Sequence, residues 1–341
     1  MRKAIIFFSI IIVFAVFVVS GLHKERNSKE KSLLGMKEFF MMHKGIERRY
    51  LVNAPKGYDV QRPLPVVLNF HGGGGNADGM EPMAHMSATA DAHNFIVVYP
   101  EATGTKFLGT LIGAWNTGLD ERFAHVDDVG FISALINVLK KDFSVDDARI
   151  YATGISNGAQ MVYRLACERS DLITAIAPVG SQSVTGACSL KRPVPVIHFH
   201  GTEDKCAFYN GGVCGGCIAD YFKGLTGITV KTVEHQCESV PDAFRKVIAM
   251  NGIQNKAPVV VYKNNNAECT AYGQEEAGES VLCVVKGMGH TWPGGGYGKP
   301  CEDGYETKKC KEYVNVVGAL SNDISANEMI WEFFSKFSLK K

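Results

Sequence analysis

Residues 149–168 read Arg-Ile-Tyr-Ala-Thr-Gly-Ile-Ser-Asn-Gly-Ala-Gln-Met-Val-Tyr-Arg-Leu-Ala-Cys-Glu, and no other stretch constrains the architecture as strongly. A β-rich run ends at Thr153, Gly154-Ile-Ser-Asn-Gly158 follows at once, and a helical pattern continues to Glu168. A turn this tight needs glycines around the serine, which it holds in a strained conformation above the sheet. The following helix directs N–H groups towards the serine oxygen. A chance motif among 36 glycines is the alternative, but the strand before and the helix after favour a nucleophilic Ser156.

Other short apolar runs have the character of strands, and helical patterns lie between them. The predicted strands are Leu64–Phe70, Phe95–Tyr99, Arg149–Thr153, Val194–Phe199, Val259–Tyr262 and Val281–Val285. The predicted helices begin at Asp127 or Asp128, at Asn157 and at Ala326. This alternation predicts an α/β fold with a doubly wound, mostly parallel sheet and helices on both faces. No repeat or linker divides residues 37–341, so we expect one domain with its reactive groups at the carboxyl ends of strands.

The segment His71-Gly-Gly-Gly-Gly75 follows the strand that ends at Phe70. Glycines let a backbone approach a substrate closely, and an acyl-transfer enzyme needs at least two N–H donors for its oxyanion. We expect these donors to be the N–H of Asn157 and that of Gly72 or Gly73. A dinucleotide fingerprint is the rival interpretation, with Gly72-x-Gly-x-x-Ala77 before a helix and Glu101 after the next strand. It leaves Ser156 unexplained, and an exported protein would rarely meet free NAD.

His290 is the candidate general base, because it lies on a glycine-rich loop after the strand Val281–Val285. His235 is a rival without a strand to deliver it. The candidate acid is Asp204, which follows the strand Val194–Phe199 and would accept the Nδ1 proton of His290.

Glu203 and the pair Asp127-Asp128 are rival acids. Asp127 and Asp128 precede the nucleophile, against the order nucleophile, acid, histidine, so they are interpreted chiefly as a helix cap.

Trp115 and Trp292 lie in glycine-flanked loops close to these motifs. A flat indole ring suits stacking on an aromatic acid or on a sugar face, so both are candidate substrate-binding residues. Packing beneath the loops is the alternative, and the sequence does not separate the two roles.

The first residues have the character of a targeting segment. Arg2 and Lys3 precede an apolar stretch from Ala4 to Val19, so residues 1–21 are predicted to be a signal peptide or a retained membrane anchor, and residues 22–36 a polar tether. Either role places the folded part outside the cytoplasmic membrane, as a secreted, extracellular or periplasmic protein.

All ten cysteines lie between Cys167 and Cys310, and an even number in an exported chain favours disulfides. A zinc site is the alternative, since Cys214-Gly-Gly-Cys217 has ligand spacing and Cys206 lies nearby. A second such pair is missing, so we expect no metal.

The formal net charge of +1 and the scattered basic residues argue against nucleic acid as a partner. Membrane contact is expected only through the N-terminal segment. The chemistry inferred above requires no cofactor.

These motifs resemble the esterase family that includes secreted polyhydroxybutyrate depolymerases and feruloyl and acetylxylan esterases. The resemblance rests on seven segments: His71–Gly75, Ala114–Asn116, Val126–Phe131, Tyr151–Gly158, Tyr163–Cys167, His200–Asp204 and Gly289–Gly295. It implies the α/β-hydrolase fold and the triad Ser156, Asp204 and His290. It also implies hydrolysis of a polyester or of a feruloyl or acetyl ester of the plant cell wall.

The chain departs from the family pattern in the cysteine-rich stretch 205–217 and in the segment 300–321, which leaves the substrate open. A serine peptidase with the same triad is the alternative enzyme. A carbohydrate-binding protein without activity is a further alternative, although an intact triad makes it a poor fit.

Overall fold

The computed structural model describes residues 36–107, 110–182, 188–230, 232–253 and 257–339. Ten strands form one sheet in the order β1-β2-β4-β3-β7-β8-β9-β14-β13-β12. The strands are β1 (Lys37–His43), β2 (Ile46–Asn53), β3 (Leu64–Phe70), β4 (Ile96–Pro100), β7 (Val145–Ile155), β8 (Ile176–Val179), β9 (Val196–Gly201), β12 (Val259–Asn264), β13 (Ala267–Tyr272) and β14 (Ser280–Val285). The six central strands β4, β3, β7, β8, β9 and β14 are parallel, and the outer strands are antiparallel.

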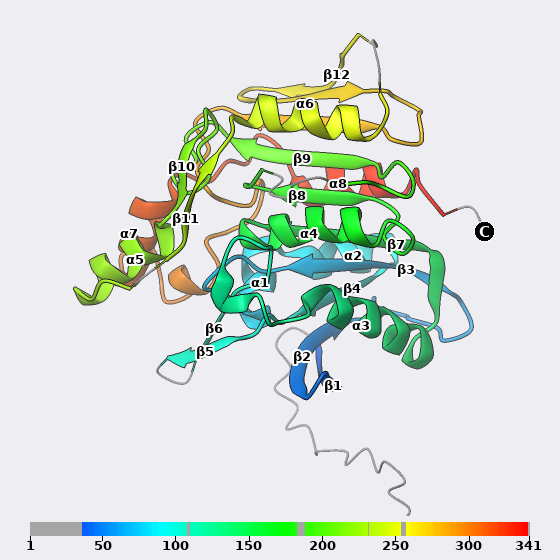
Figure 1. Ribbon diagram of the computed structural model, residues 1–341, viewed down its shortest axis with the longest axis horizontal. Coiled ribbons are helices and arrows are strands. Elements are labelled where there is room, and N and C mark those ends of the chain that lie inside the picture. The colour runs from blue at the N-terminus through cyan, green and yellow to red at the C-terminus, as the bar shows by residue number, and fades with distance from the viewer. Residues whose placement is uncertain (1–35, 108–109, 183–187, 231, 254–256, 340–341) are drawn as a thin grey trace, which may run out of the picture.

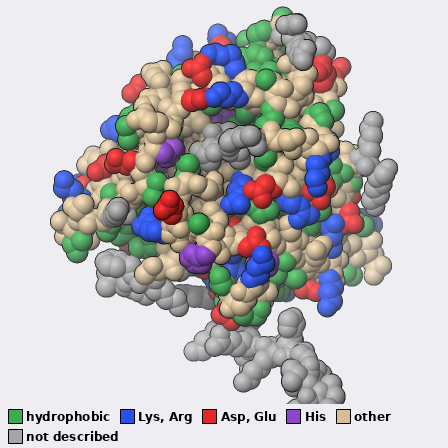
Figure 2. All heavy atoms as spheres, viewed as in Figure 1, with side chains coloured by type: hydrophobic (Ala, Val, Ile, Leu, Met, Phe, Trp, Pro, Cys, Tyr) green, Lys and Arg blue, Asp and Glu red, His purple; other side chains and the backbone are tan. Residues whose placement is uncertain are grey.

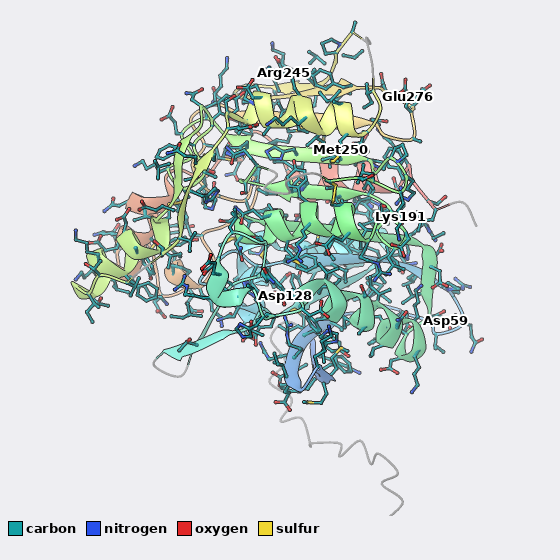
Figure 3. All side chains as sticks on the ribbon, viewed as in Figure 1. Asp59, Asp128, Lys191, Arg245, Met250 and Glu276 are labelled. Carbon is teal, nitrogen blue, oxygen red and sulfur yellow. A yellow bond between two sulfur atoms is a disulfide. The ribbon has the colours of Figure 1, made fainter. Side chains whose placement is uncertain are left out.

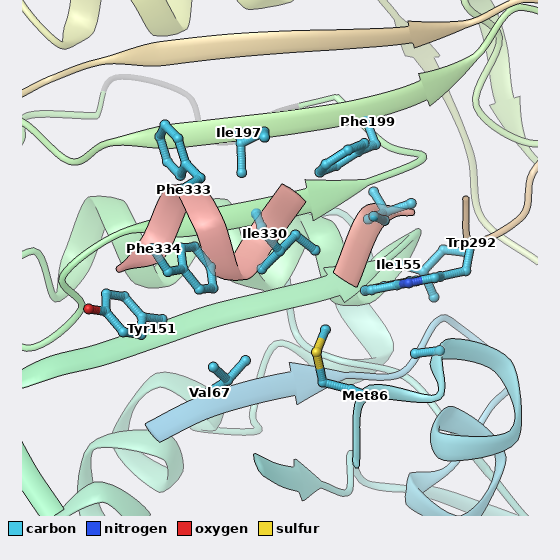
Figure 4. Packing of buried hydrophobic residues seen from close by; sticks show 14 of the residues in the cluster. Val67, Met86, Tyr151, Ile155, Ile197, Phe199, Trp292, Ile330, Phe333 and Phe334 are labelled. Atoms are coloured by element: carbon cyan, nitrogen blue, oxygen red, sulfur yellow. The ribbon is translucent and has the colours of Figure 1, made fainter. Parts of the chain in front are cut away.

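Helices cover both faces of this sheet (Figure 1). The helices are α1 (Ala77–Ala84), α2 (Met86–His93), α3 (Asp128–Asp142), α4 (Asn157–Glu168), α5 (Cys217–Thr226), α6 (Val240–Met250), α7 (Lys308–Val317) and α8 (Ala326–Phe334). One buried cluster joins α1, α2 and α8 to the sheet, and Figure 4 shows Phe334 stacked on Tyr151 there, with Ile330 further along α8. A second cluster joins α3, α4 and α6 to the opposite face. The predicted doubly wound sheet with helices on both faces is therefore confirmed.

All six predicted strands are present, as are the three predicted helices. The strands β1, β2, β8 and β13 of this sheet were not predicted. Nor were two small two-stranded sheets, one of β5 (Gly104–Phe107) with β6 (Thr110–Gly113) and one of β10 (Gly212–Gly215) with β11 (Glu234–Cys237). The run that begins at Val259 forms an antiparallel edge strand whose first three valines are exposed, so it is not one of the parallel strands covered by helices. An apolar run identifies a strand, but its place in the sheet depends on partners far away in the sequence.

Five disulfides pair all ten cysteines: Cys167–Cys188, Cys206–Cys217, Cys214–Cys237, Cys269–Cys283 and Cys301–Cys310. The disulfide interpretation is confirmed, and the zinc alternative fails because its thiolates are used. Such bonds suit an oxidising, extracellular environment.

The predicted leader, residues 1–21, and nearly all of the tether, residues 22–36, lie outside the described residues and stay predictions. Within the described ranges, no helix combines the length and the apolar character that crossing a bilayer requires. Figure 2 shows Lys and Arg side chains interspersed with Asp and Glu on the face in view.

The acidic pair at the start of α3 serves two different purposes. Asp127 is the N-cap, and its side chain accepts the N–H of Gly130 at 2.9 Å, as expected for a helix cap. Asp128 is buried and pairs with buried Arg48 of β2 at 2.7 Å; Figure 3 labels its position at the end of α3 that faces β2. Its second oxygen accepts the N–H of Asn116 at 2.7 Å. Asp128 therefore anchors the loop that carries Trp115.

Asp128→Ala should lower the free energy of unfolding by about 3–5 kcal/mol, because it leaves the Arg48 charge buried and unpaired. Asp127→Ala is the matched control and should cost about 1 kcal/mol, the usual effect of losing an N-cap. Denaturant unfolding with the disulfides intact measures both values. Equal losses would show that the buried pair contributes no more than a surface cap.

Candidate active site

Ser156 occupies the sharp corner between β7 and α4. Its backbone has φ 59° and ψ −123°, a left-handed conformation that non-glycine residues rarely adopt and that persists only where the surroundings impose it. Its N–H donates to Val179 O of the neighbouring strand β8 at 2.9 Å. The corner predicted from the glycine-flanked motif is present, with the serine at the carboxyl end of a central parallel strand.

Asp204 and His290 lie together although 86 residues separate them. His290 Nδ1 donates to Asp204 Oδ2 at 2.7 Å, and both side chains are buried. The other oxygen, Oδ1, accepts the N–H groups of Cys206 at 2.8 Å and Ala207 at 2.7 Å. Burial alone would raise the pKa of Asp204, but His290 and these hydrogen bonds outweigh it and hold the pKa below its ordinary value. The acid is thus ionised and oriented to hold one tautomer of the imidazole.

Gly180 lies against the Asp204–His290 pair, and the sequence alone did not single it out. It follows β8, the strand between β7, which leads to Ser156, and β9, which leads to Asp204. A Cβ on Gly180 would lie 3.3 Å from His290 Nδ1 and 3.5 Å from Asp204 Oδ2. The His290 ring therefore lies against Gly180, and the strand that leads to Gly180, β8, pairs with β7, the strand that leads to Ser156.

Asp204 binds Nδ1 of the His290 ring, which leaves Nε2 for Ser156. Both residues are among those described, but no hydrogen bond joins Ser156 Oγ to His290 Nε2 in this structure. Such contacts are often long without substrate and tighten when it binds.

The glycine loop runs directly over the serine. A Cβ on Gly72 would lie 3.3 Å from Ser156 Cβ, and one on Gly73 would lie 3.5 Å from Asn157 Cβ. Within the described residues, the N–H groups of Gly74 and Gly75 bind Gly113 O and Gly72 O, whereas those of Gly72, Gly73 and Asn157 donate to no protein group. These three predicted oxyanion donors therefore lie around the serine and are available to a ligand.

His71 holds this loop in place rather than facing a substrate. Its Nδ1 donates to Gly72 O at 2.8 Å and its Nε2 accepts the N–H of Ala102 at 3.1 Å, so the ring is neutral. Burial lowers its pKa to about 4.

Glu101, the acidic residue that the dinucleotide interpretation requires for a ribose, is already bonded within the protein. Glu101 Oε2 forms a 2.7 Å ion pair with Arg49 and accepts the N–H of Ala77 at 3.3 Å. The carboxylate is therefore occupied by the protein itself, at the N-terminus of the helix that a pyrophosphate would need.

The predicted substrate-binding role of Trp115 and Trp292 is wrong as stated, because both rings are in the core. Their exposed fractions are 1% and 0%. Trp115 Nε1 donates to His71 O at 3.0 Å, and Trp292 Nε1 to Asn327 Oδ1 at 2.9 Å. Figure 4 shows the Trp292 ring among buried apolar side chains. The packing alternative fits: the two rings support the glycine loop and the histidine loop from beneath.

The cysteine-rich insertion connects two sides of the site. Cys206, whose N–H binds Asp204, is joined by a disulfide to Cys217 at the start of α5. The next residue, Ile218, packs against the glycine loop, since a Cβ on Gly74 would lie 3.1 Å from Ile218 Cδ1. One disulfide therefore links the turn of the acid to a helix beside the oxyanion loop. Cys206 lies close enough to Asp204 and His290 to suggest a metal site, but its sulfur is already bonded.

Comparison with known proteins finds relatives among esterases. A family model described as "Esterase PHB depolymerase" matches residues 49–215. The chain is 28% identical over 249 residues to feruloyl esterase B of Piromyces equi, covering 71% of this chain and 42% of that protein. It is 25% identical over 279 residues to a probable feruloyl esterase C of Aspergillus flavus, covering 76% and 94%. The chain thus spans less than half of the Piromyces protein and nearly all of the Aspergillus one.

Among solved structures, an acetyl xylan esterase from Aspergillus awamori matches with a TM-score of 0.51 and 15% identity, covering 75% of this chain and 94% of that one. This likeness shows the fold. The α/β-hydrolase fold and the resemblance to the polyhydroxybutyrate depolymerase and feruloyl esterase family are therefore confirmed.

Gly180→Ala should lower kcat by about 10²-fold, because a methyl group there displaces the His290 ring and catalysis tolerates little misplacement. Gly252→Ala is the matched control, since Gly252 also has positive φ, 74°, but nothing within 4 Å of a Cβ. Steady-state kinetics of both variants separates displacement of the ring from backbone strain. Equal activity of the two would remove Gly180 from the site.

Lowering the pH from 7 to 5 should destabilise the protein through His71. Its folded pKa is lowered to about 4, against about 6.5 unfolded, so the unfolded state binds the extra proton and this residue's contribution falls by about 2 kcal/mol. His71→Asn keeps an N–H donor but cannot titrate over this range. Its free energy of unfolding should therefore depend less on pH by that amount; an identical slope would contradict a neutral, buried His71.

Proposed function

We propose that this chain hydrolyses carboxylic esters through an acyl-enzyme formed on Ser156. The observation that carries the proposal is the buried pair of Asp204 and His290 beside a serine held at φ 59°. A strained serine corner alone can be structural. A histidine tethered by a carboxylate and resting one strand away gives that serine a base.

In the proposed reaction His290 takes the proton of Ser156 as its oxygen attacks the ester carbonyl. Asp204, ionised and held by two N–H groups, stabilises the resulting imidazolium. The developing oxyanion binds the N–H groups of Asn157 and of Gly72 or Gly73. His290 then protonates the departing alcohol, and water repeats the cycle on the acyl-enzyme to release the acid and restore Ser156.

The proposed substrate is a feruloyl or acetyl ester of the plant cell wall or a polyester of the polyhydroxybutyrate kind. Relatives named as feruloyl esterases support the first class, and the matching family model supports the second. The helix α5 and its residue Ile218 border the glycine loop, so they are the elements of this chain that would shape the acyl site. We also propose that residues 1–21 direct export, with cleavage or retention deciding between a secreted and a membrane-anchored enzyme.

Ser156→Ala should lower kcat for esters by roughly 10⁴- to 10⁶-fold, as removal of other triad serines does. Ser335→Ala, at an exposed serine after α8, is the control and should behave as the wild type. The assay panel is p-nitrophenyl acetate, methyl ferulate, polyhydroxybutyrate and a peptide amide.

Full activity of Ser156→Ala on every ester would end the proposal. Faster cleavage of the amide than of any ester by the wild type would favour the peptidase alternative instead.

A further inference from the structure

A chain of buried polar groups extends behind Asp204, away from His290. The hydroxyl of Tyr163, on α4, lies 2.9 Å from His198 Nδ1. His198 Nε2 lies 3.1 Å from His200 Nδ1, and His200 Nε2 lies 2.7 Å from Ala207 O. Tyr163 is 3% exposed, His198 1% and His200 0%. Buried polar groups of this kind must be hydrogen-bonded to each other, because water is not available to them.

The proton positions along this chain of hydrogen bonds can be assigned in order, starting from Ala207 O. Ala207 O can only accept, so His200 Nε2 carries a hydrogen. Burial lowers the pKa of both His200 and His198, which keeps the rings neutral. His200 Nδ1 is then a bare acceptor for His198 Nε2–H, and His198 Nδ1 in turn accepts the hydroxyl hydrogen of Tyr163. All the donors point in the same direction, from α4 towards the turn that carries Asp204.

The last donor of this chain, His200 Nε2, lies close to the acid of the proposed triad. His200 Nε2 lies 3.5 Å from Asp204 Oδ2, the same oxygen that accepts His290 Nδ1 at 2.7 Å. His200 also fixes Ala207 through its carbonyl, and the N–H of Ala207 donates to Asp204 Oδ1. The single Nε2 hydrogen of neutral His200 is donated to Ala207 O, so His200 acts on the carboxylate through Ala207, whose N–H binds Oδ1.

The groups packed around His200 do not compete with the hydrogen bonds that run from Tyr163 towards Ala207. Among the described residues, the titratable groups that face it are Asp204 and His290 from the two catalytic loops, and His198 from its own strand. Tyr209 lies edge-on against the His200 ring, and Phe244 of α6 lies against His198. Within the described part of the chain, the Asp204 carboxylate is therefore bonded by His290 and by the N–H groups of Cys206 and Ala207, and His200 fixes the second of these.

We propose that His200 is a positioning residue of the triad, with its proton pattern set by His198 and Tyr163. By fixing Ala207, whose N–H binds Oδ1, it holds the Asp204 carboxylate in the orientation that receives His290. The proposal rests on the proposed function, since it concerns the same reaction. It also gives α4 a second role, because this helix begins at the nucleophile and, through Tyr163, anchors the acid.

The experiment compares His200→Leu with His200→Gln, whose amide nitrogen can take the place of Nε2. With p-nitrophenyl acetate we expect His200→Leu to lower kcat by about 10- to 100-fold with little change in KM, because the loss is one of orientation. The acid limb of its kcat/KM profile should move to higher pH, since Asp204 then loses the ordered N–H of Ala207 and interacts more strongly with protonated His290. His200→Gln should recover most of kcat.

Full kcat and an unmoved acid limb in folded His200→Leu would overturn the inference, as would a His200→Gln variant no better than His200→Leu. An inactive wild type would count against the proposed function itself, whereas an active wild type with inactive Ser156→Ala and unaffected His200→Leu would reject the positioning role alone. The ¹⁵N spectrum of wild-type histidines tests the proton pattern without any variant. Both His198 and His200 should be neutral with hydrogen on Nε2 at neutral pH, and hydrogen on His200 Nδ1 would contradict the proposal.

Discussion

The site depends on how closely β7 and α4 approach β3 at the serine corner. A Cβ on Gly154 would lie 2.7 Å from Phe70 O, and one on Gly158 would collide with the same carbonyl. Only a backbone without side chains at these two positions lets the corner form against the neighbouring strand. The close contact also brings the end of β3, and therefore the glycine loop, over Ser156. One steric constraint thus sets both the conformation of Ser156 and the position of the proposed oxyanion donors.

The parts of the fold that could be predicted are those determined by residues that are neighbours in the sequence. Gly154 and Gly158 flank the serine in sequence, so the corner, the strand before it and the helix after it were all visible. Asp204 and His290 could be selected because each follows an apolar run, and the carboxyl ends of parallel strands lie on one edge of the sheet. Gly180 was not selected, although it follows the short strand β8. Its importance comes from the rings above it, and contacts across the sheet leave no local pattern.

The two tryptophans also show that a local sequence pattern does not reveal tertiary contacts. Their positions beside the catalytic loops were correct, but exposure of a ring is a property of the packed structure. Trp115 is held between the glycine loop and the buried pair of Arg48 and Asp128, and Trp292 lies beneath the loop that it follows. His200 likewise has no local sequence pattern that distinguishes it from an ordinary core histidine. Its link to Asp204 depends on a turn whose conformation the cysteine-rich insertion helps to fix.

The five disulfides lie in only one part of the sequence, so only that part depends on oxidation for its cross-links. All five bonds lie after Ser156 in sequence, and one of them involves Cys206, whose N–H holds Asp204. The earlier half, with the glycine loop and the serine corner, contains no cysteine and so is cross-linked nowhere within itself. A copy stranded in a reducing compartment would therefore carry an assembled nucleophile and a poorly anchored acid. With the export proposed above, the oxidation that closes Cys206–Cys217 would also fix the turn of Asp204, so the proposed site would be completed after export.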